Sequence, residues 1–226
     1  SMPSAVGGRN LHQMLAHKGR MYVLGGWHGD TRPYYRDVWF APIDTDGSLG
    51  SFVATTSLPD DPDTTQDHGQ FSAHVSDDGV LTVATRTRIH TADVLADGQV
   101  GAFESFGPVE DLFHRNYGNG SLVMHNGHLV LVDPHKTFVF ALDVNGRPVQ
   151  VVGQVNNPAE LHCMSAYVWD GNVYVATSTW TDPHQSTQGV LYRIDGLPAA
   201  ACAPGSCGGS PVVCDDSNPC THHSCD

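Results

Sequence analysis

The sequence predicts an all-β protein, a β-propeller of four blades followed by a short cysteine-rich tail. Three observations lead to this prediction. The same hairpin pattern recurs four times in the 226 residues, and each hairpin is followed by a third strand that ends in an Asp-Gly or Asn-Gly turn. No capped segment of useful length has the 3.6-residue periodicity of a helix. Repeated units of four antiparallel strands are typical of propeller blades.

Each unit begins with an apolar strand, a turn that ends in glycine, and a second apolar strand. Glycine supplies the positive φ that tight hairpins require. The four hairpins are MLAHKGRMYVLGG, FSAHVSDDGVLTVAT, SLVMHNGHLVLVD and SAYVWDGNVYVAT, and their turn glycines are Gly19, Gly79, Gly127 and Gly171.

The third strands lie in the segments DVWFAPIDTDG, TADVLADG, FVFALDVNG and VLYRIDG. A fourth strand follows in three units, in SFVATTSLP, AFESFGPV and VQVVGQV. The last unit has no such segment, and the residues before Leu11 are the candidate to supply it and close the ring. The ring then has four blades, or borrows a fifth sheet from elsewhere in the chain. A β-sandwich with similar hairpins is the alternative fold. We place the propeller at residues 9–200 and the tail at residues 201–226.

The charge balance excludes some partners. The chain has 24 acidic and 11 basic residues, which gives a net charge of −13. This charge repels nucleic acid backbones and anionic membrane surfaces. No apolar run approaches the roughly 20 residues that span a bilayer. We therefore expect no nucleic acid partner and no membrane insertion, and the sequence leaves the oligomeric state open.

The cysteines indicate where the protein acts. Five of the six lie after residue 200, and Cys163 stands alone. Such density is typical of disulfides formed in an oxidising compartment. We expect an extracellular or cell-surface protein, although the first residues lack the features of a signal peptide. The dipeptide Ser1-Met2 looks like the remnant of a tag, so an export signal would have been removed.

Two parts of the chain resemble known families. The first unit, GRMYVLGGWHGDTRPYYRDVWFAPIDTDGSLGSFVATTSLP, resembles a bacterial kelch repeat, with Gly25 and Gly26 ending the second strand. The other three units are closer to the blades of propeller lyases and sialidase-like proteins. The tail segment CDDSNPCTHHSC is similar to a short cysteine-rich repeat of slime-mould matrix proteins and myxobacterial surface proteins. The first resemblance implies a propeller fold, and the second implies a surface setting.

Histidines recur at one position of every unit, the start of the first strand. In a propeller these strands surround the central axis, so the side chains would converge there. Neutral imidazoles are ligands for zinc, iron, copper, nickel or manganese. We therefore predict one transition metal ion, with zinc favoured and iron, manganese or copper as the other candidates. The predicted ligands are His12, His68, His114 and His162, although His17 is an alternative to His12 on strand parity.

A second set of histidines follows the second strand of each unit. In a propeller these loops share one face with the first-strand starts, so we expect catalytic groups there. The candidates are His28, His90, His135 and His184, together with Arg115 as an anion clamp and Tyr117 as a proton donor. Trp27 and Trp180 precede His28 and His184 on these loops, where an indole face would stack on a sugar or aryl group. In Asp133-Pro134-His135 the carboxylate would hold the imidazole in one tautomer.

These residues favour a secreted metal-dependent enzyme that hydrolyses esters or phosphoesters of a small molecule or carbohydrate, because a metal-activated water and an imidazole base are sufficient for that reaction. A polysaccharide lyase is the second hypothesis, since propeller lyases resemble this use of histidine, tyrosine and arginine. A four-histidine iron oxygenase is a further one. The competing class is a non-catalytic propeller that binds carbohydrate or protein, in which the histidines are ordinary loop residues.

Overall fold

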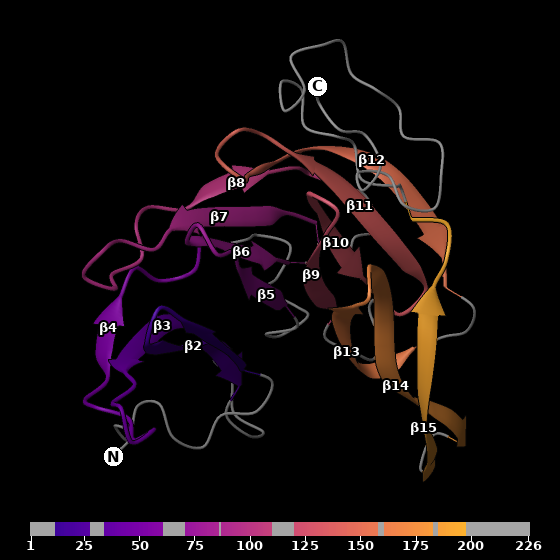
Figure 1. Cartoon of the computed structure of the whole chain (residues 1–226), viewed down its shortest axis with the longest axis horizontal. Helices are drawn as coiled ribbons and strands as arrows, with labels where there is room; N and C mark the ends of the chain where they lie inside the picture. Colours follow the sequence, from indigo (N-terminus) through magenta and orange to yellow (C-terminus); the bar gives the residue numbers. More distant parts are fainter. Residues whose placement is uncertain are drawn as a thin grey trace, which may run out of the picture.

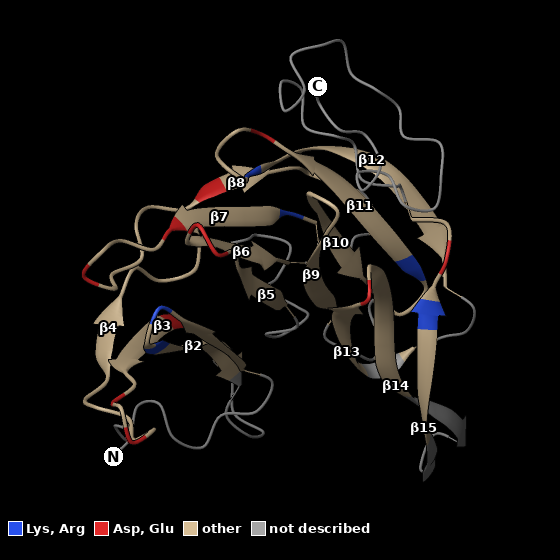
Figure 2. Ribbon diagram, in the orientation of Figure 1, with Lys and Arg blue, Asp and Glu red and all other residues tan. Residues whose placement is uncertain are grey.

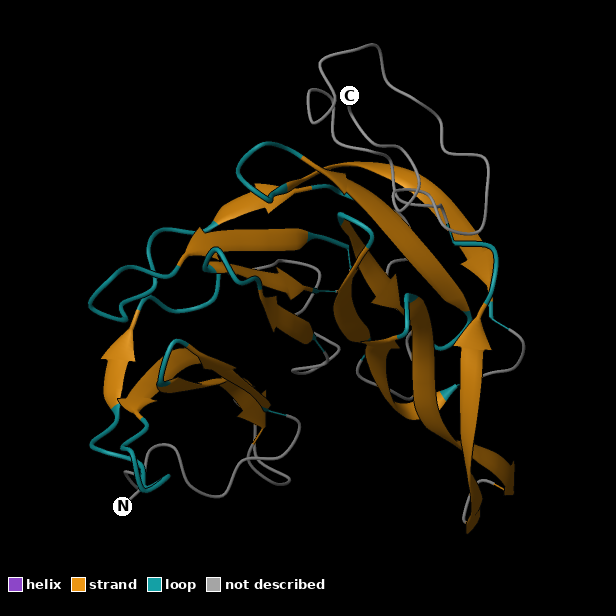
Figure 3. Cartoon of the chain, in the orientation of Figure 1, coloured by secondary structure: helices purple, strands orange, loops and turns teal. Residues whose placement is uncertain are grey.

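The computed structural model describes residues 12–27, 34–60, 71–85, 87–109, 120–157, 161–182 and 185–197. These residues form four separate antiparallel sheets, arranged as the blades of a four-bladed propeller. Figures 1 and 3 show the sheets side by side around an arc, with the first and last blades at its two ends and no helix in the described part of the chain. The predicted fold class is confirmed.

The blades follow one another along the chain. Blade 1 holds β1 (Gln13–His17), β2 (Arg20–Trp27), β3 (Tyr34–Pro42) and β4 (Val53–Thr55). Blade 2 holds β5 (Ser72–Val75), β6 (Val80–Ala84), β7 (Ile89–Asp93) and β8 (Glu104–Phe106). Blade 3 holds β9 (Ser121–His125), β10 (His128–Val132), β11 (Lys136–Leu142) and β12 (Pro148–Asn156). Blade 4 holds β13 (His162–Trp169), β14 (Asn172–Asp182) and β15 (Gln185–Ile194).

The fourth strands β4, β8 and β12 lie in the segments where the sequence predicts them, and blade 4 has three strands among the described residues. The residues before Leu11, considered for completing blade 4, lie outside the described residues, as does the cysteine-rich tail. No helix in the described ranges is long and apolar enough to cross a membrane.

Tight turns join the first two strands of three blades. The residues that close these turns pair as His17 with Arg20, His125 with His128, and Trp169 with Asn172. In blade 3 both turn residues have positive φ, 49° at Asn126 and 72° at Gly127. This is the backbone of a type I′ turn, which the Asn-Gly dipeptide adopts readily. The turn glycines therefore set the register of these hairpins.

A second turn, between the third and fourth strands, is fixed by aspartates. Asp46 accepts the backbone N–H of Ser48 at 2.9 Å, and Asp97 accepts that of Gln99 at 2.9 Å. Asp143 accepts the backbone N–H of Arg147 at 2.9 Å. These backbone hydrogen bonds lower the pKa of Asp46 and Asp143 below the ordinary value. Figure 2 shows many of the acidic residues at turns and strand ends, so much of the negative charge has a local structural role.

Three hydrophobic clusters hold the blades together. Successive side chains of a strand point to opposite faces of its sheet, and a blade between two neighbours must bury both faces. Strand β6 therefore has every residue buried. The first cluster joins blade 1 to blade 2 and contains Tyr22, Leu24, Val38 and Phe40 of blade 1 with Phe71, Ala73, Leu81, Val83 and Ala92 of blade 2. The second joins blade 2 to blade 3 and contains Ala84 and Ile89 of blade 2 with Leu122, Leu129, Leu131, Phe138 and Phe140 of blade 3. The third joins blade 3 to blade 4 and contains Val123, Val130, Val132 and Val139 of blade 3 with Met164, Val173, Val175 and Ile194 of blade 4.

Gly25 and Gly26, the residues that resemble a kelch repeat, form an irregular end to β2. Both have positive φ, 51° and 104°, and the register with β3 shifts between Leu24 and Gly26. A Cβ atom on Gly25 would lie 2.8 Å from the ring of Phe71. The missing side chain thus lets the first aromatic residue of blade 2 pack directly against the backbone of blade 1.

Candidate functional site

The described strands support the geometric premise of the predicted site. In every blade the first residues of the first strand pair with the last part of the second strand. The pairs are Gln13 with Leu24, Ser72 with Ala84, Ser121 with Val132, and His162 with Ser178. First-strand starts and second-strand ends therefore share one edge of each sheet, which we call the site edge. The innermost strands β1, β5, β9 and β13 contact one another in that order.

Two of the four predicted metal ligands have a described backbone, and both lie at the site edge. His12 immediately precedes β1 and its ring is half-buried. His162 is the first residue of β13. The side chain of His162, and the whole of His68 and His114, lie outside the described part of the structure. His17, the alternative to His12, ends β1 at the opposite edge beside the turn at Gly79, so the structure does not favour it.

His135 lies in the short connection between β10 and β11, where the sequence predicts it. Its backbone N–H donates to a carboxylate oxygen of Asp133 at 3.1 Å. The Asp133 side chain is only 2% exposed. A buried carboxylate therefore shapes the backbone of this loop.

The same loop is tied to the start of blade 4. Leu161 donates its backbone N–H to the carbonyl of Pro134 at 2.9 Å, and Asn157 donates its backbone N–H to the carbonyl of His135 at 2.8 Å. His162 follows Leu161 directly, so the chain segments that carry His135 and His162 lie side by side. These two neighbouring segments carry one histidine from each predicted set.

Asn157 is the residue at this junction that sequence reasoning missed. Its side-chain amide donates to the carbonyl of Asp133 at 2.5 Å, and its side-chain oxygen accepts from the hydroxyl of Thr137 at 2.7 Å. Thr137 is fully buried. One asparagine thus fixes the start and the end of the His135 loop. The segment VNNPAE carries no local signal for this role, because the partners lie about 20 residues earlier.

His90 corrects a prediction. It was expected in the loop after the second strand of blade 2, but it is the second residue of β7. Thr85 uses both its backbone N–H and its hydroxyl to bond the carbonyl of Arg88, so the loop ends before Ile89. The His90 ring is 2% exposed and its Nδ1 lies 2.8 Å from the hydroxyl of Ser105. It faces blade 1 from within the blade and is unsuited to contact a substrate at the site edge.

The two tryptophans are also placed differently from the prediction. Trp27 is the last residue of β2, and Trp180 lies within β14, where it pairs with Ser186 of β15. Strand pairing in blade 4 continues to Asp182 and Gln185, which leaves only residues 183–184 between the strands. Neither tryptophan backbone is therefore in a loop. Their side chains, and the predicted site residues His28, Arg115, Tyr117 and His184, lie outside what the structure describes.

Three further histidines lie in strands of the described sheets. His74 is in β5, His125 ends β9 and His128 begins β10. Burial lowers the pKa of His74 and of His125 below the ordinary value, so both are neutral near pH 7. Across the described residues no three or more histidine, cysteine, aspartate or glutamate side chains are grouped to hold a metal ion.

Comparisons with known proteins give likenesses of fold at low sequence identity. No family model matches the chain, and no curated protein matches it. Among solved structures, a protein from Lactobacillus plantarum is similar over 78% of this chain and 53% of its own, at 15% identity and a TM-score of 0.46. The GH32 β-fructofuranosidase of Bombyx mori is similar over 80% of this chain and 46% of its own, at 14% identity and a TM-score of 0.47. An exo-1,5-α-L-arabinanase from a bovine ruminal metagenomic library is similar over 83% and 76%, at 10% identity and a TM-score of 0.45. The chain spans about half the length of the first two proteins.

Proposed function

We propose that the protein is a secreted or surface-displayed metal-dependent hydrolase of esters or phosphoesters, acting at the site edge on a small-molecule or carbohydrate substrate. The observation that carries the proposal is the hydrogen bond from Leu161 to the carbonyl of Pro134, 2.9 Å long. It joins the His135 loop to the segment that begins with His162. One histidine from each predicted set is thereby held in one small region of the molecule.

The proposed metal ligands are the histidines that the sequence predicts at the first-strand starts, namely His68, His114 and His162, with His12 as the fourth. Neutral imidazoles fit zinc by their donor chemistry, and three or four of them leave a coordination position for substrate or water. A zinc ion held there supplies Lewis acidity and lowers the pKa of water toward neutrality. Of these histidines, His162 is the first residue of the innermost strand β13, and His12 immediately precedes the innermost strand β1.

The proposed acid and base groups belong to the second set. His135 is the proposed base, because its loop is fixed at both ends by Asn157 and shaped by the buried Asp133. His28 and His184 belong to the same proposed set, as do Arg115 as anion clamp and Tyr117 as proton donor. Trp27 and Trp180 are proposed to bind the substrate. His90 is removed from this set because its ring is buried between blades.

The first test is elemental analysis of protein purified without nickel resin, followed by titration with zinc. We expect close to one metal ion per chain, and loss of that ion in His162→Ala and His114→Ala. His128→Ala is the matched control, because His128 is on a first hairpin at the edge opposite the site. The variant pair must keep the circular dichroism spectrum of the parent. Unchanged metal content in both folded variants would exclude this ligand set.

The reaction class is tested next, on protein that contains the metal. We expect turnover of an ester or phosphoester in a substrate panel, lost on chelation and reduced in His135→Ala with the metal still bound. A folded protein that holds no metal, does not reload and binds glycans in the presence of chelator would instead be a non-catalytic binding propeller. Turnover of an acidic polysaccharide by elimination would identify the lyase.

A further inference from the structure

One face of blade 4 is exposed at positions that are buried in every other blade. In each sheet one face is directed toward the next blade along the chain, and we call it the forward face. Four equivalent third-strand positions on it are Val38, Ile89, Thr137 and Leu191, which pair with Leu24, Ala84, Val132 and Ala176 respectively. The first three are 0% exposed, whereas Leu191 is 56% exposed. The forward face of blade 4 therefore lacks the cover that the other blades have.

This face is aromatic as well as exposed. Tyr167 and Tyr174 are paired across β13 and β14, with stacked rings 5.9 Å apart. The ring of Trp169 lies 5.8 Å from that of Tyr174. Tyr167 is 40% exposed and Trp169 is 66% exposed. Clustered aromatic side chains on an open sheet face are typical of an interaction surface.

Blade 1 is exposed at part of its other face, the backward face, although Val23 and Ala41 on that face are buried. Met14 is 55% exposed, whereas Ala73 and Leu122, its equivalents in blades 2 and 3, are 7% and 5% exposed. Leu49 bridges to Ile43 just as Val100 bridges to Val94 in blade 2. Val100 is buried at 2% in the cluster with blade 1, and Leu49 is 38% exposed. Blade 1 thus presents apolar side chains of the kind that blades 2 and 3 insert into their predecessors.

The contact between blades 1 and 2 shows how these two faces fit together. The turn of blade 2 lies against blade 1, where Tyr22 donates its hydroxyl to the carbonyl of Gly98 at 3.1 Å. A Cβ atom on Gly98 would lie 2.8 Å from the Phe40 ring, so the approach is close. Gly47 is the equivalent glycine in the turn of blade 1, and a Cβ atom there would have no neighbour within 4 Å. The blade 2 turn is therefore packed against blade 1 at Gly98, whereas the blade 1 turn has no neighbouring atoms at the equivalent position, Gly47.

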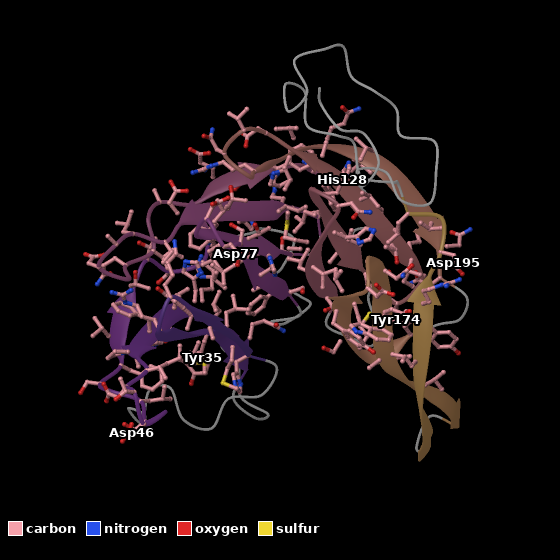
Figure 4. The ribbon with its side chains drawn as sticks, viewed as in Figure 1. Tyr35, Asp46, Asp77, His128, Tyr174 and Asp195 are labelled. Atoms are coloured by element: carbon pink, nitrogen blue, oxygen red, sulfur yellow. The ribbon has the colours of Figure 1, made fainter. Side chains whose placement is uncertain are left out.

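Tyr174 is the equivalent of Tyr22 in blade 4. Both are the third residue after the hairpin glycine, and both lie on the forward face. Figure 4 labels Tyr174 on the last blade and Asp46, the neighbour of Gly47, on the first blade, at opposite sides of the molecule. The hydroxyl donor on blade 4 and the turn carbonyl that could accept from it on blade 1 are thus at opposite ends of the arc in a single chain.

We propose that a second copy of this chain covers the forward face of blade 4 with the backward face of its blade 1. Leu49 of one copy packs against Tyr167, Ala176 and Leu191 of the other, and the Tyr174 hydroxyl donates to the carbonyl of Gly47 of the second copy. The occupant follows from the repetition of one interface. An interface of this kind joins blades 1 and 2, blades 2 and 3, and blades 3 and 4. The two faces that would form a fourth such interface, one on blade 4 and one on blade 1, have exposed apolar side chains at the two ends of the arc. An interface between unlike faces is heterologous, so copies associate head to tail and form a ring if the rotation closes.

The test is sedimentation equilibrium of the full chain over a range of concentrations. We expect the mean mass to rise with concentration, and Leu191→Glu and Leu49→Glu each to weaken association roughly 10- to 100-fold, because each places an unpaired carboxylate in the interface. Tyr174→Phe should weaken it by about two- to ten-fold, the value of one hydrogen bond. Leu95→Glu is the matched control, since Leu95 is 48% exposed in the equivalent turn of blade 2 and belongs to neither face.

Mixing provides the decisive measurement. Leu191→Glu retains an intact blade 1, and Leu49→Glu retains an intact blade 4 face. In an equimolar mixture the two intact faces can pair, so the mixture should form dimers with about the affinity of a single wild-type interface. That result would also show that both variants are folded. A wild-type chain that stays monomeric at all concentrations would overturn the proposal. If the strands of blades 1 and 4 were also protected from hydrogen exchange in that monomer, the two faces would cover each other within one chain. Association that survives both substitutions, or a mixture that remains monomeric, would overturn it as well.

Discussion

The guanidinium group of Arg147 in blade 3 lies 3.0 Å from each carboxylate oxygen of Asp93 in blade 2. The same side chain contacts Glu104 of blade 2 through its other terminal nitrogen. The Arg147 side chain is 18% exposed, whereas the two carboxylates are 59% and 71% exposed. One arginine thus clamps the turn of blade 3 to two strands of blade 2.

We predict that Arg147→Ala lowers the free energy of unfolding by about 1 kcal/mol. Exposed ion pairs contribute little, but one cation with two partners and a packed aliphatic chain is at the upper end of the range. Urea denaturation of the parent and the variant measures the difference. The loss should shrink as salt is added, because the carboxylates are exposed. A change that is independent of salt would assign the effect to packing alone. Glu104→Gln, which keeps the length of the side chain, is the control for charge.

Gly98 and Gly47 give a matched pair for close packing between blades. Both occupy the same turn position, with φ of 92° and 82°. Alanine at either site pays for a positive φ, about 1 kcal/mol. At Gly98 the new methyl would also collide with the Arg20 side chain and the Phe40 ring, at 2.4 and 2.8 Å.

We therefore predict that Gly98→Ala lowers the free energy of unfolding by about 1–3 kcal/mol more than Gly47→Ala does. Both should be measured in the Leu191→Glu background, so that self-association does not contribute. Equal losses in the two variants would mean that Arg20 and Phe40 move aside at no cost, and the close contact between blades 1 and 2 would then not be rigid.

The turns could be predicted from sequence because their chemistry is local. Asn126 and Gly127 both have positive φ, and an Asn-Gly dipeptide by itself predicts such a turn. The position of His90 could not be predicted, because it depends on pairing with Ser105 of the adjacent strand β8 and on where the Thr85 loop closes. The difference between Leu191 and Ile89 is also hidden from sequence. Both are apolar strand residues, and only the arrangement of the blades decides which one is covered.

The candidate site could be predicted only in part, because its shared sheet edge follows from strand order whereas its long-range hydrogen bonds do not. Strand order alone places the starts of first strands beside the ends of second strands, so the shared edge followed from the repeats. The junction of the His135 loop with blade 4 did not, because it rests on hydrogen bonds from Asn157 and Leu161 to residues more than 20 positions earlier. Contacts of that kind leave no periodic pattern in a sequence.

The buried histidine His125 links stability to pH. It ends β9 on the face toward blade 4, is 6% exposed, and its Nε2 lies 3.0 Å from the side-chain nitrogen of Asn126. If Nε2 accepts this hydrogen bond, the proton is on Nδ1, which has no hydrogen-bond partner among the described residues. Burial lowers the pKa of His125, and repulsion from His128 lowers it further.

Because the folded state binds this proton less readily than the unfolded chain, whose histidine has a pKa near 6.5, protonation favours unfolding. The free energy of unfolding should be highest above pH 6.5 and fall as the pH decreases toward the lowered pKa of the folded state. His74 and His17, whose pKa values are also lowered by burial, contribute in the same direction. Urea denaturation between pH 7.5 and pH 5 measures the slope, and His125→Gln should make it shallower whatever its effect on stability at pH 7.5. A slope identical to that of the parent would show that His125 takes up its proton without opposing the packing of blades 3 and 4.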